Sequence, residues 1–499
     1  MKRDPLTDEP EGVRVRKIDL NPKKDEALTG RKHNMELSIA AWIFVALFAL
    51  LIGRVVFINL FEAEDLRSNP NNTKADSNTD NVIRGDIRTL DGTVLATTLI
   101  DESGNQTRSY PFNHIFAHVV GYATNGKSGL EAEENYDLMS THSSLLKQIR
   151  AEEKGEKVQG DRVVVTLDER LQQTAYYALG SYRGAVVVME PDSGRILAMV
   201  SKPDFNPNVI GMEWESLVAD SSSSVLLNRA TQGLYPPGST FKMITTLAYL
   251  RAHPEDYSSF LWNCEGFLTE GDVRITCYGD QVHGQEDLAG AFANSCNTAF
   301  ANIGLELDNT DMRKTAEEFL FNHSLPTGMQ HSQSVFTLEK DSSLGEQMTT
   351  AIGQGDTLVT PLHMALITSA IANGGVMMRP YCVDHVETND GTIVRQNDPE
   401  IYKKVMTPDE AGILAGYMAR TAESGTAAAL SGNGYTVAGK TGSAEYERDG
   451  ETGTHSWFCG FAQTQEPHIA IAVIAEDGGT GSATAVPIAK QILDAFFYG

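Results

Sequence analysis

The chain has 499 residues, of which 41% are hydrophobic and 21% are charged. This length and composition are ordinary for a folded protein of two or three domains. The formal net charge of −26 argues against a nucleic-acid binder, because such proteins carry basic patches that neutralise phosphates. A strongly acidic, solvated surface suits small or cationic partners instead.

The N-terminal part predicts a membrane anchor. Residues 1–34 are polar with both charge signs, and we expect a cytoplasmic disordered tail. Residues 35–60 hold an apolar run long enough to cross a bilayer, with Arg54 able to reach the interface. A core helix or a signal peptide is disfavoured, because the run shows neither an amphipathic period nor a small-x-small cleavage site. Basic residues precede the run and acidic ones follow it, which places everything after about residue 61 outside the cell.

Residues 61–160 predict a small mixed α/β module outside the membrane. Its first part, residues 62–82, is rich in Asn, Asp and Thr and indicates a linker. Residues 84–96 predict two short strands about a turn at Asp91-Gly92. Residues 115–120 predict a further strand, followed by a glycine-rich turn and a helix-prone stretch.

Residues 161–499 predict a second, larger domain. Strand patterns stand at its beginning and its end, and helical runs fill the middle. The expected elements are a strand at 162–168, a helix through 179, a hairpin within 185–200, strands at 436–438, 458–462 and 469–475, and a helix at 487–497. Sheet elements first and last with helices between them predict an α+β domain.

The five cysteines are spread out and form no Cys-x-x-Cys pair. We therefore expect neither a disulfide scaffold nor a metal site. Cys264 and Cys277 would be able to pair in an oxidising compartment, but free buried thiols are at least as good an interpretation. Cys296, Cys382 and Cys459 are interpreted as small core residues.

A candidate nucleophile follows the helix-breaking segment 236–238, Pro-Pro-Gly. Ser239 is expected at a helix N-terminus, where the helix end stabilises negative charge. Lys242 lies one turn on and shares its face, so a desolvated amine there would take the serine proton. Ser-x-x-Lys is a signature of serine acyl-transfer enzymes. The alternative is a helix cap and a solvated lysine, and the pattern recurs at Ser144-Leu-Leu-Lys147.

Two later segments supply what such a nucleophile needs. Ser295 and Asn297 offer a hydroxyl and an amide two residues apart, in a loop expected between helical runs. The strand-like segment Lys440-Thr441-Gly442-Ser443 offers a cation, two hydroxyls and a glycine that allows close approach of a ligand. A polar turn and an ordinary edge strand are the alternatives. Similar tripeptides occur elsewhere, but no other ordered set includes a Ser-x-x-Lys after a Pro-Pro-Gly break.

A rival site is the segment Gly121–Ser128, which matches the phosphate-binding loop of nucleotide-binding proteins. Residues 163–169 even resemble the apolar strand and acid that would hold Mg²⁺. Three carboxylates follow the loop where phosphates would sit, and the surrounding sheet elements do not alternate as repeated βαβ units. The loop is also expected outside the membrane, where ATP is scarce. We therefore prefer the serine site.

The three serine-site motifs, in this order, resemble those of the penicillin-recognising serine acyltransferases. From residue 37 on, the chain is similar to a class B penicillin-binding protein, a bacterial cell-wall D,D-transpeptidase. Arg84–Ala96 and Gly126–Glu131 resemble that family's non-catalytic pedestal or dimerisation module, which accounts for the false phosphate loop. Further similar segments are 235–242, 352–355, 360–361 and 457–461. Ser443 stands where threonine is commoner, and the module is too short for the glycosyltransferase domain of class A proteins.

The resemblance implies an antiparallel sheet with helices on both sides, and a mechanism. Ser239 would attack the penultimate D-Ala of a stem pentapeptide, with neutral Lys242 as base. The positive field of Lys440 would keep Lys242 neutral. The backbone N–H groups of Ser239 and Ser443 would form the oxyanion hole. Ser295 would pass a proton to the departing D-Ala.

The remaining implied roles concern binding. Asn297 would hold Lys242 and the substrate amide, while Lys440, Thr441 and Ser443, with Gly442 between them, would bind the terminal carboxylate. A second stem amine would resolve the acyl-enzyme, and a β-lactam would acylate the same serine. No metal, nucleotide or other cofactor is implied. The expected partner is a polytopic glycosyltransferase of the shape, elongation, division and sporulation (SEDS) family. The alternatives are a β-lactam sensor or an idle scaffold of the same fold, and a D-Ala-D-Ala carboxypeptidase that uses water as the acceptor.

Overall fold

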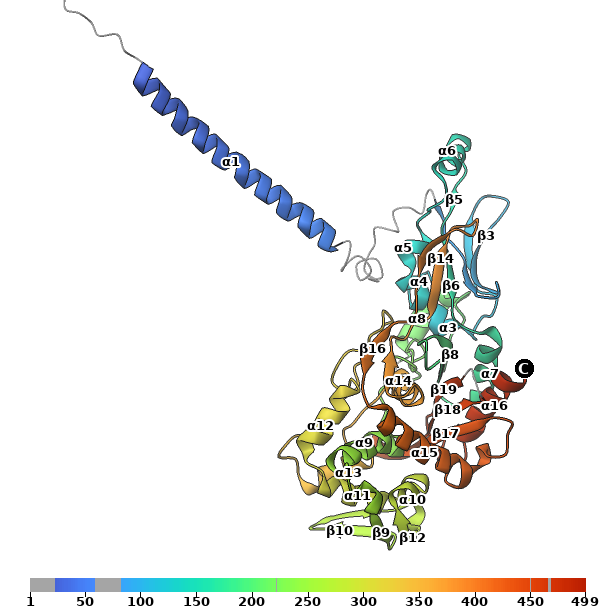
Figure 1. Ribbon diagram of the computed structural model, residues 1–499. Helices are drawn as coiled ribbons and strands as arrows, with labels where there is room; N and C mark the ends of the chain where they lie inside the picture. The colour runs from blue at the N-terminus through green and yellow to red at the C-terminus, as the bar shows by residue number, and fades with distance from the viewer. Residues whose placement is uncertain (1–22, 59–81, 221, 449, 465–467) are drawn as a thin grey trace, which may run out of the picture. The chain divides into compact units, whose positions relative to one another are not determined.

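A computed structural model describes residues 23–58, 82–220, 222–448, 450–464 and 468–499 (Figure 1). The chain divides into two compact units, one ending at residue 66 and one beginning at residue 67. The first unit contains the anchor helix, and the second contains everything from strand β1 onward.

Helix α1 spans Lys23–Phe57, and its part Leu37–Phe57 has a mean hydropathy of 2.5 with no burial of its side chains. It is the only helix among the described residues that is long and apolar enough to cross a membrane. The expectation of disorder is wrong for residues 23–34, which are helical. Lys, Glu, Ala and Leu are good helix formers, and adding turns to an existing helix avoids the cost of nucleation. Residues 1–22, and nearly all of the predicted linker, lie outside the described residues.

A six-stranded sheet forms one part of the second unit, in the order β15-β14-β6-β2-β3-β4. Its strands are β2 (Ile87–Thr89), β3 (Val94–Ile100), β4 (Gln106–Ser109), β6 (Arg162–Val165), β14 (Val383–Glu387) and β15 (Ile393–Gln396). The hairpin predicted about Asp91-Gly92 is confirmed as β2 and β3. The division near residue 160 stays a prediction, and this sheet takes strands from both sides of it.

Small elements complete this region. They are β1 (Val82–Ile83) paired with β5 (Val158–Gln159), and the helices α3 (Ala117–Val120), α4 (Gly129–Glu133), α5 (Asn135–Leu138) and α6 (Leu145–Lys154). A buried ion cluster fixes α4 to the sheet, because the Glu131 carboxylate binds Arg84 at 2.6 Å and Arg108 at 2.7 Å. Burial alone would raise the pKa of Glu131, but the two arginines outweigh it and hold that pKa below its usual range.

The strand predicted at residues 115–120 is wrong, because α3 lies there. Phe116, Val119 and Val120 all enter the core, and their i, i+3, i+4 spacing is that of a helix face. The loop that follows does not form a phosphate cradle. A side chain at Gly121 would meet the Ser128 carbonyl oxygen at 1.8 Å, so the loop is closed on itself. The nucleotide-binding interpretation also requires a strand directly before the loop, and helix α3 lies there instead.

A five-stranded antiparallel sheet, in the order β17-β18-β19-β7-β8, is the centre of the larger part. The strands are β7 (Gly184–Met189), β8 (Ile196–Lys202), β17 (Thr436–Arg448), β18 (Glu451–Gln463) and β19 (His468–Ala475). The hairpin predicted within 185–200 is confirmed, and the later strands are longer than predicted at one or both ends.

Helices cover both faces of this sheet, as the predicted fold class requires. On one face, Val186 and Val188 pack with α7 (Glu169–Leu179) and α16 (Ala485–Tyr498), which lie beside the sheet in Figure 1. On the other face, Val187 and Met189 belong to the core that contains α9 (Lys242–Ala252) and α14 (Pro361–Ala372). Strand β7 is buried throughout, which explains its unbroken apolar sequence.

The middle of the chain, on either side of α9, consists of helices and short strands. The helices are α8 (Ile210–Ala219), α10 (Leu288–Ala293), α11 (Asn297–Glu306), α12 (Asn309–Glu318), α13 (Leu344–Ala351) and α15 (Pro408–Ser424), with short 3₁₀ turns η3 (Gly238–Phe241), η4 (Tyr257–Ser259), η5 (Tyr278–Asp280) and η6 (Ala428–Leu430). The short strands are β9 (Leu261–Cys264), β10 (Phe267–Glu270), β11 (Val273–Thr276), β12 (Gly284–Asp287), β13 (Val376–Met378) and β16 (Ile401–Lys404). Strands β9, β10 and β12 lie with α10 at the lower end of the molecule in Figure 1.

Candidate active site

Ser239 lies in the 3₁₀ turn η3, which leads directly into α9 at Lys242. Gly238 adopts φ +53°, a conformation that favours glycine, and its N–H donates to the Gly353 carbonyl at 2.9 Å. The side chain of Ser239 is half-buried, whereas its neighbours Thr240 and Phe241 are buried. The predicted helix start is therefore present, with a tighter first turn than an α-helix.

Lys242 is fully buried and its ammonium has three polar partners. Its Nζ donates to the Ser295 carbonyl at 2.8 Å and to Asn297 Oδ1 at 2.8 Å, with Ser295 Oγ at 3.4 Å. Burial lowers the pKa of Lys242 from 10.5 to about 8, because the charged amine loses its hydration. A substantial fraction of this lysine is therefore neutral near physiological pH.

Ser295 and Asn297 occupy the turn between α10 and α11, as the sequence predicted. Ser295 adopts φ +58°, which costs a non-glycine residue free energy and is common where a side chain must be aimed at a site. Asn297 begins α11, and its Nδ2 donates to the Thr276 carbonyl at 3.0 Å. This second contact fixes the amide so that its oxygen faces Lys242.

Lys440 reaches the same serine from the opposite side. It lies on β17, its Nζ donates to Ser295 Oγ at 2.8 Å and to the Thr441 carbonyl at 3.1 Å, and it is fully buried. Burial, and then the charge of Lys242, lower the pKa of Lys440 well below its ordinary value. Both lysines hydrogen-bond the same hydroxyl, so the titrations of the two amines are coupled. The charge of Lys242 thus lowers the pKa of Lys440, whereas burial, and not the field of Lys440 that the resemblance implied, lowers the pKa of Lys242.

The rest of the β17 segment is packed closely against the nucleophile turn. A side chain at Gly442 would stand 3.1 Å from the Pro237 carbonyl oxygen, so glycine allows the strand to pass. The Thr441 hydroxyl lies 2.5 Å from that of Thr426, and Ser443 Oγ accepts from the Gly481 N–H at 3.4 Å. Within the described residues β17 pairs only with β18, so its other edge is available to a peptide.

Two residues of this site were missed by the sequence analysis. Thr426 follows α15 in a loop with no recognisable motif, and only the fold brings it to Thr441. Trp457 was noted only as part of a similar segment, yet its fully buried indole donates to the Pro236 carbonyl at 3.0 Å. That hydrogen bond holds the strand β18 to the segment that precedes the nucleophile.

The second Ser-x-x-Lys match has a different environment. Ser144 also stands at a helix N-terminus, that of α6, but it is exposed. The side chain of Lys147 is 57% exposed and pairs with Asp390 at 2.7 Å. An exposed, ion-paired lysine keeps its hydration, so this pair lacks the buried amine that Lys242 provides.

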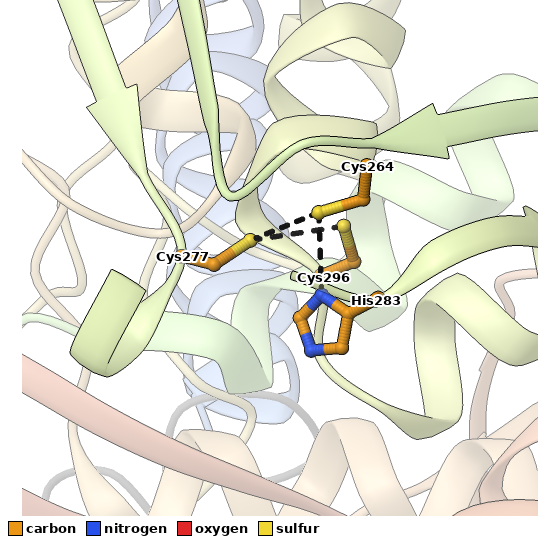
Figure 2. A group of neighbouring side chains, drawn as sticks. All are labelled: Cys264, Cys277, His283 and Cys296. Carbon is orange, nitrogen blue, oxygen red and sulfur yellow. Dashed lines mark hydrogen bonds between the residues drawn. The ribbon is translucent and has the colours of Figure 1, made fainter. Parts of the chain in front are cut away.

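Three of the five cysteines, although spread out in the sequence, meet in the fold, and the expectation that they form no metal site stays a prediction. Cys264, Cys277 and Cys296 lie together with His283, and Figure 2 shows their sulfur atoms and the imidazole facing one another. Cys296 is therefore part of a cluster and is not simply a core residue. Cys382 and Cys459 are buried core residues as predicted.

The chain as a whole is similar to known proteins. Residues 184–494 match the penicillin binding protein transpeptidase domain, and residues 84–163 match the penicillin binding protein A dimerisation domain. The peptidoglycan D,D-transpeptidase PbpA of Mycolicibacterium smegmatis is 33% identical over 490 residues, covering 93% of this chain and 99% of that protein.

Two solved structures are similar as well. The D,D-transpeptidase domain of a peptidoglycan glycosyltransferase from Eggerthella lenta has a TM-score of 0.75 at 32% identity, covering 83% of this chain and 97% of its own. The penicillin G acyl-enzyme complex of penicillin-binding protein A from Mycobacterium tuberculosis has a TM-score of 0.75 at 31% identity, covering 83% and 99%. Because the transpeptidase match covers more than half of the chain and the relatives are aligned over nearly their full length, this chain belongs to the class B penicillin-binding proteins.

Proposed function

We propose that this protein is a membrane-anchored peptidoglycan D,D-transpeptidase whose nucleophile is Ser239. The observation that carries the proposal is the convergence of Lys242 and Lys440 on Ser295 Oγ beside the turn that bears Ser239. The similarity to a D,D-transpeptidase and to a penicillin G acyl-enzyme supports the same reaction.

In the acylation step, Ser239 Oγ attacks the carbonyl carbon of the penultimate D-Ala and its proton passes to neutral Lys242. The backbone N–H groups of Ser239 and Ser443 stabilise the oxyanion. The peptide C–N bond then breaks, and Ser295 delivers the proton that the departing D-Ala amine requires. Lys440 is placed to return a proton to Ser295, because the two are hydrogen-bonded at 2.8 Å.

In the second step, a stem-peptide amine attacks the acyl-enzyme, so that the new amide C–N bond forms and the ester C–O bond to Ser239 breaks. The amine loses one proton through Ser295 to Lys440, and Lys242 returns to Ser239 the proton that it took in the first step. The donor peptide lies along the unpaired edge of β17, where main-chain hydrogen bonds hold it as an added strand. Thr441, Ser443 and the Lys440 ammonium bind its terminal carboxylate, while Asn297 binds its amide. A β-lactam takes the same pose and leaves a stable acyl-enzyme.

The proposal includes location and partner. Helix α1 crosses the membrane once with its N-terminus in the cytoplasm, because basic residues precede it and acidic ones follow it. The side chains of Leu37–Phe57 are exposed in the isolated chain, and this apolar surface is the one that we expect to contact a polytopic SEDS-family glycosyltransferase in the membrane. Co-purification with that enzyme, compared with a chain carrying an unrelated span, tests the pairing. A sensor or an idle scaffold is less well supported, since all catalytic side chains are present.

The test is acylation of the full chain in detergent by a penicillin, followed by intact mass and peptide mapping. In the wild-type chain we expect one adduct, on Ser239. The Ser239→Ala variant should carry no adduct, and the Ser144→Ala variant should carry the same adduct on Ser239 as the wild type. The last variant is a matched control, because Ser144 begins the other Ser-x-x-Lys sequence. Crosslinking of pentapeptide stems by Ser239→Ala would disprove the assignment, and so would an adduct that maps elsewhere.

A further inference from the structure

A group of soft side chains lies directly behind the Ser295 turn and has no part in the proposed reaction. The sulfur atoms of Cys264 and Cys277 are 3.7 Å apart, and those of Cys277 and Cys296 are 3.8 Å apart. Nδ1 of His283 stands 3.4 Å from the sulfur of Cys264. All four of these atoms lie within 4.8 Å of one another (Figure 2).

These distances have the dimensions of a tetrahedral metal site. Zinc binds thiolate at about 2.3 Å and imidazole at about 2.0 Å. A tetrahedron with those bonds has edges of about 3.8 Å between sulfurs and about 3.5 Å between sulfur and nitrogen. Three distances in the cluster, 3.7 Å, 3.8 Å and 3.4 Å, match these edges, and the remaining distances are no longer than 4.8 Å. The sulfurs are too far apart for a disulfide, whose bond is about 2.05 Å.

The backbone brings the four ligands together from three directions. Strand β9 pairs with β12 so that Cys264 lies opposite Gly284, which places His283 beside it. The β10–β11 hairpin then returns the chain, and the Cys277 N–H donates to the Gly266 carbonyl at 2.9 Å. Cys296 enters from the turn between α10 and α11. The β9–β12 and β10–β11 pairs thus serve mainly to hold this cluster.

The surroundings of the cluster suit anionic sulfur. The three cysteines are 0–2% exposed, and the N–H of Gly266 points at the Cys264 sulfur at 3.4 Å. The Thr298 hydroxyl stands 3.3 Å from the Cys296 sulfur. Hydrogen-bond donors around thiolate ligands orient them and offset their charge. Three buried cysteines and one partly exposed histidine form the donor set of a structural zinc site and not of a calcium or magnesium site.

We propose that Cys264, Cys277, His283 and Cys296 bind one Zn²⁺ ion, and that the ion fixes the turn that presents Ser295 and Asn297. Cys296 stands between these two residues, so a bond from its sulfur to the ion anchors the turn at its centre. The turn needs an anchor, because Ser295 is held at φ +58° and such conformations persist only where neighbours enforce them. The cysteines and the histidine are therefore positioning residues. Metal binding does not depend on the proposed reaction. The positioning role of the ion rests on the proposed function, because it concerns Ser295 and Asn297.

The first experiment measures metal in the full chain, purified in detergent with reductant and zinc and then freed of loosely bound ions. We expect about one zinc per chain. The Cys277→Ser variant should lose it, and the matched Cys382→Ser variant, which removes a buried thiol outside the cluster, should keep it. Replacement by Co²⁺ should give the intense thiolate-to-cobalt absorption of tetrahedral coordination, a readout that needs no variant to fold.

The second experiment removes zinc from the wild-type chain with a chelator and follows acylation by a fluorescent penicillin. We expect the rate to fall about tenfold or more, and to recover when zinc is added back. Metal-free wild-type protein, or a chain two hydrogen masses lighter with a Cys264–Cys277 disulfide, would overturn the site. Bound zinc whose removal leaves the acylation rate unchanged would overturn the positioning role. Zinc-loaded protein that no penicillin acylates would refute the proposed function and leave the metal site standing.

Discussion

The pH dependence of acylation tests the role of Lys242 more directly than its removal does. The reasoning requires the neutral amine, and burial lowers the pKa of this lysine from 10.5 to about 8. At pH 7, roughly one molecule in ten then has a neutral lysine, compared with roughly one in three thousand at the ordinary pKa. Burial therefore raises the fraction of Lys242 in the neutral form about 300-fold, which corresponds to a free-energy difference on the order of 3 kcal/mol between the two protonation states.

The expected profile follows from that pKa. Between pH 7 and pH 9 the neutral fraction rises from roughly 0.1 to roughly 0.9, so the rate of acylation should increase about tenfold and then level off. The midpoint belongs to the coupled pair, because Lys242 and Lys440 share Ser295 Oγ. The assay is stopped-flow or gel-based labelling by a fluorescent penicillin at a concentration far below saturation, corrected for hydrolysis of the free drug.

The titration of Lys242 does not destabilise the fold as the pH rises, so unfolding from this cause does not lower the measured acylation rate. The pKa of Lys242 in the folded state is lower than in the unfolded chain, so between about pH 8 and pH 10.5 the unfolded chain binds more protons. The contribution of this group to stability therefore rises with pH in that window. A labelling rate that is flat from pH 6 to pH 9, in protein whose melting curve is unchanged, would refute the neutral-lysine argument.

Three further predictions concern packing around the site and in the module. Gly442→Ala should slow acylation by about tenfold or more with little loss of stability. The added methyl group would stand 3.1 Å from the Pro237 carbonyl oxygen and displace the strand. Labelling rates measure the effect on acylation, and melting curves measure the effect on stability. Trp457→Phe should destabilise the fold by about 1–3 kcal/mol, because the Pro236 carbonyl loses its donor, and denaturant unfolding measures this. Glu131→Gln should cost about 3–5 kcal/mol by leaving two buried arginines without a counter-charge, while the acylation rate per folded molecule stays the same.

The catalytic motifs were predictable because their chemistry leaves local patterns. A Pro-Pro-Gly break before an apolar run marks the start of a helix wherever it occurs, and the structure places Ser239 and Lys242 there. The strand around Lys440 was likewise visible from its apolar neighbours. In each case the residues that determine the local structure are adjacent in the sequence, so the sequence contains the whole signal.

The failures share a different physical cause. The helix α3 was predicted as a strand because a six-residue apolar run fits either element, and burial against the rest of the core decides between them. Thr426 could not be found because its partner Thr441 is 15 residues away and no motif joins them. Both outcomes depend on tertiary contacts, which a local pattern does not report.

The cysteine cluster is another feature that depends on tertiary contacts and that local sequence patterns do not report. Absence of a Cys-x-x-Cys pair was taken as absence of a metal site, yet two short strand pairs bring the ligands together. Such small hairpins bury little apolar surface and are marginally stable on their own. A segment of this kind beside a catalytic turn needs another source of rigidity, and Cys264, Cys277 and His283 stand at or beside its strand ends. The ligand-type residues at the ends of these small, weakly cored strand pairs are therefore the feature on which the proposed zinc site rests.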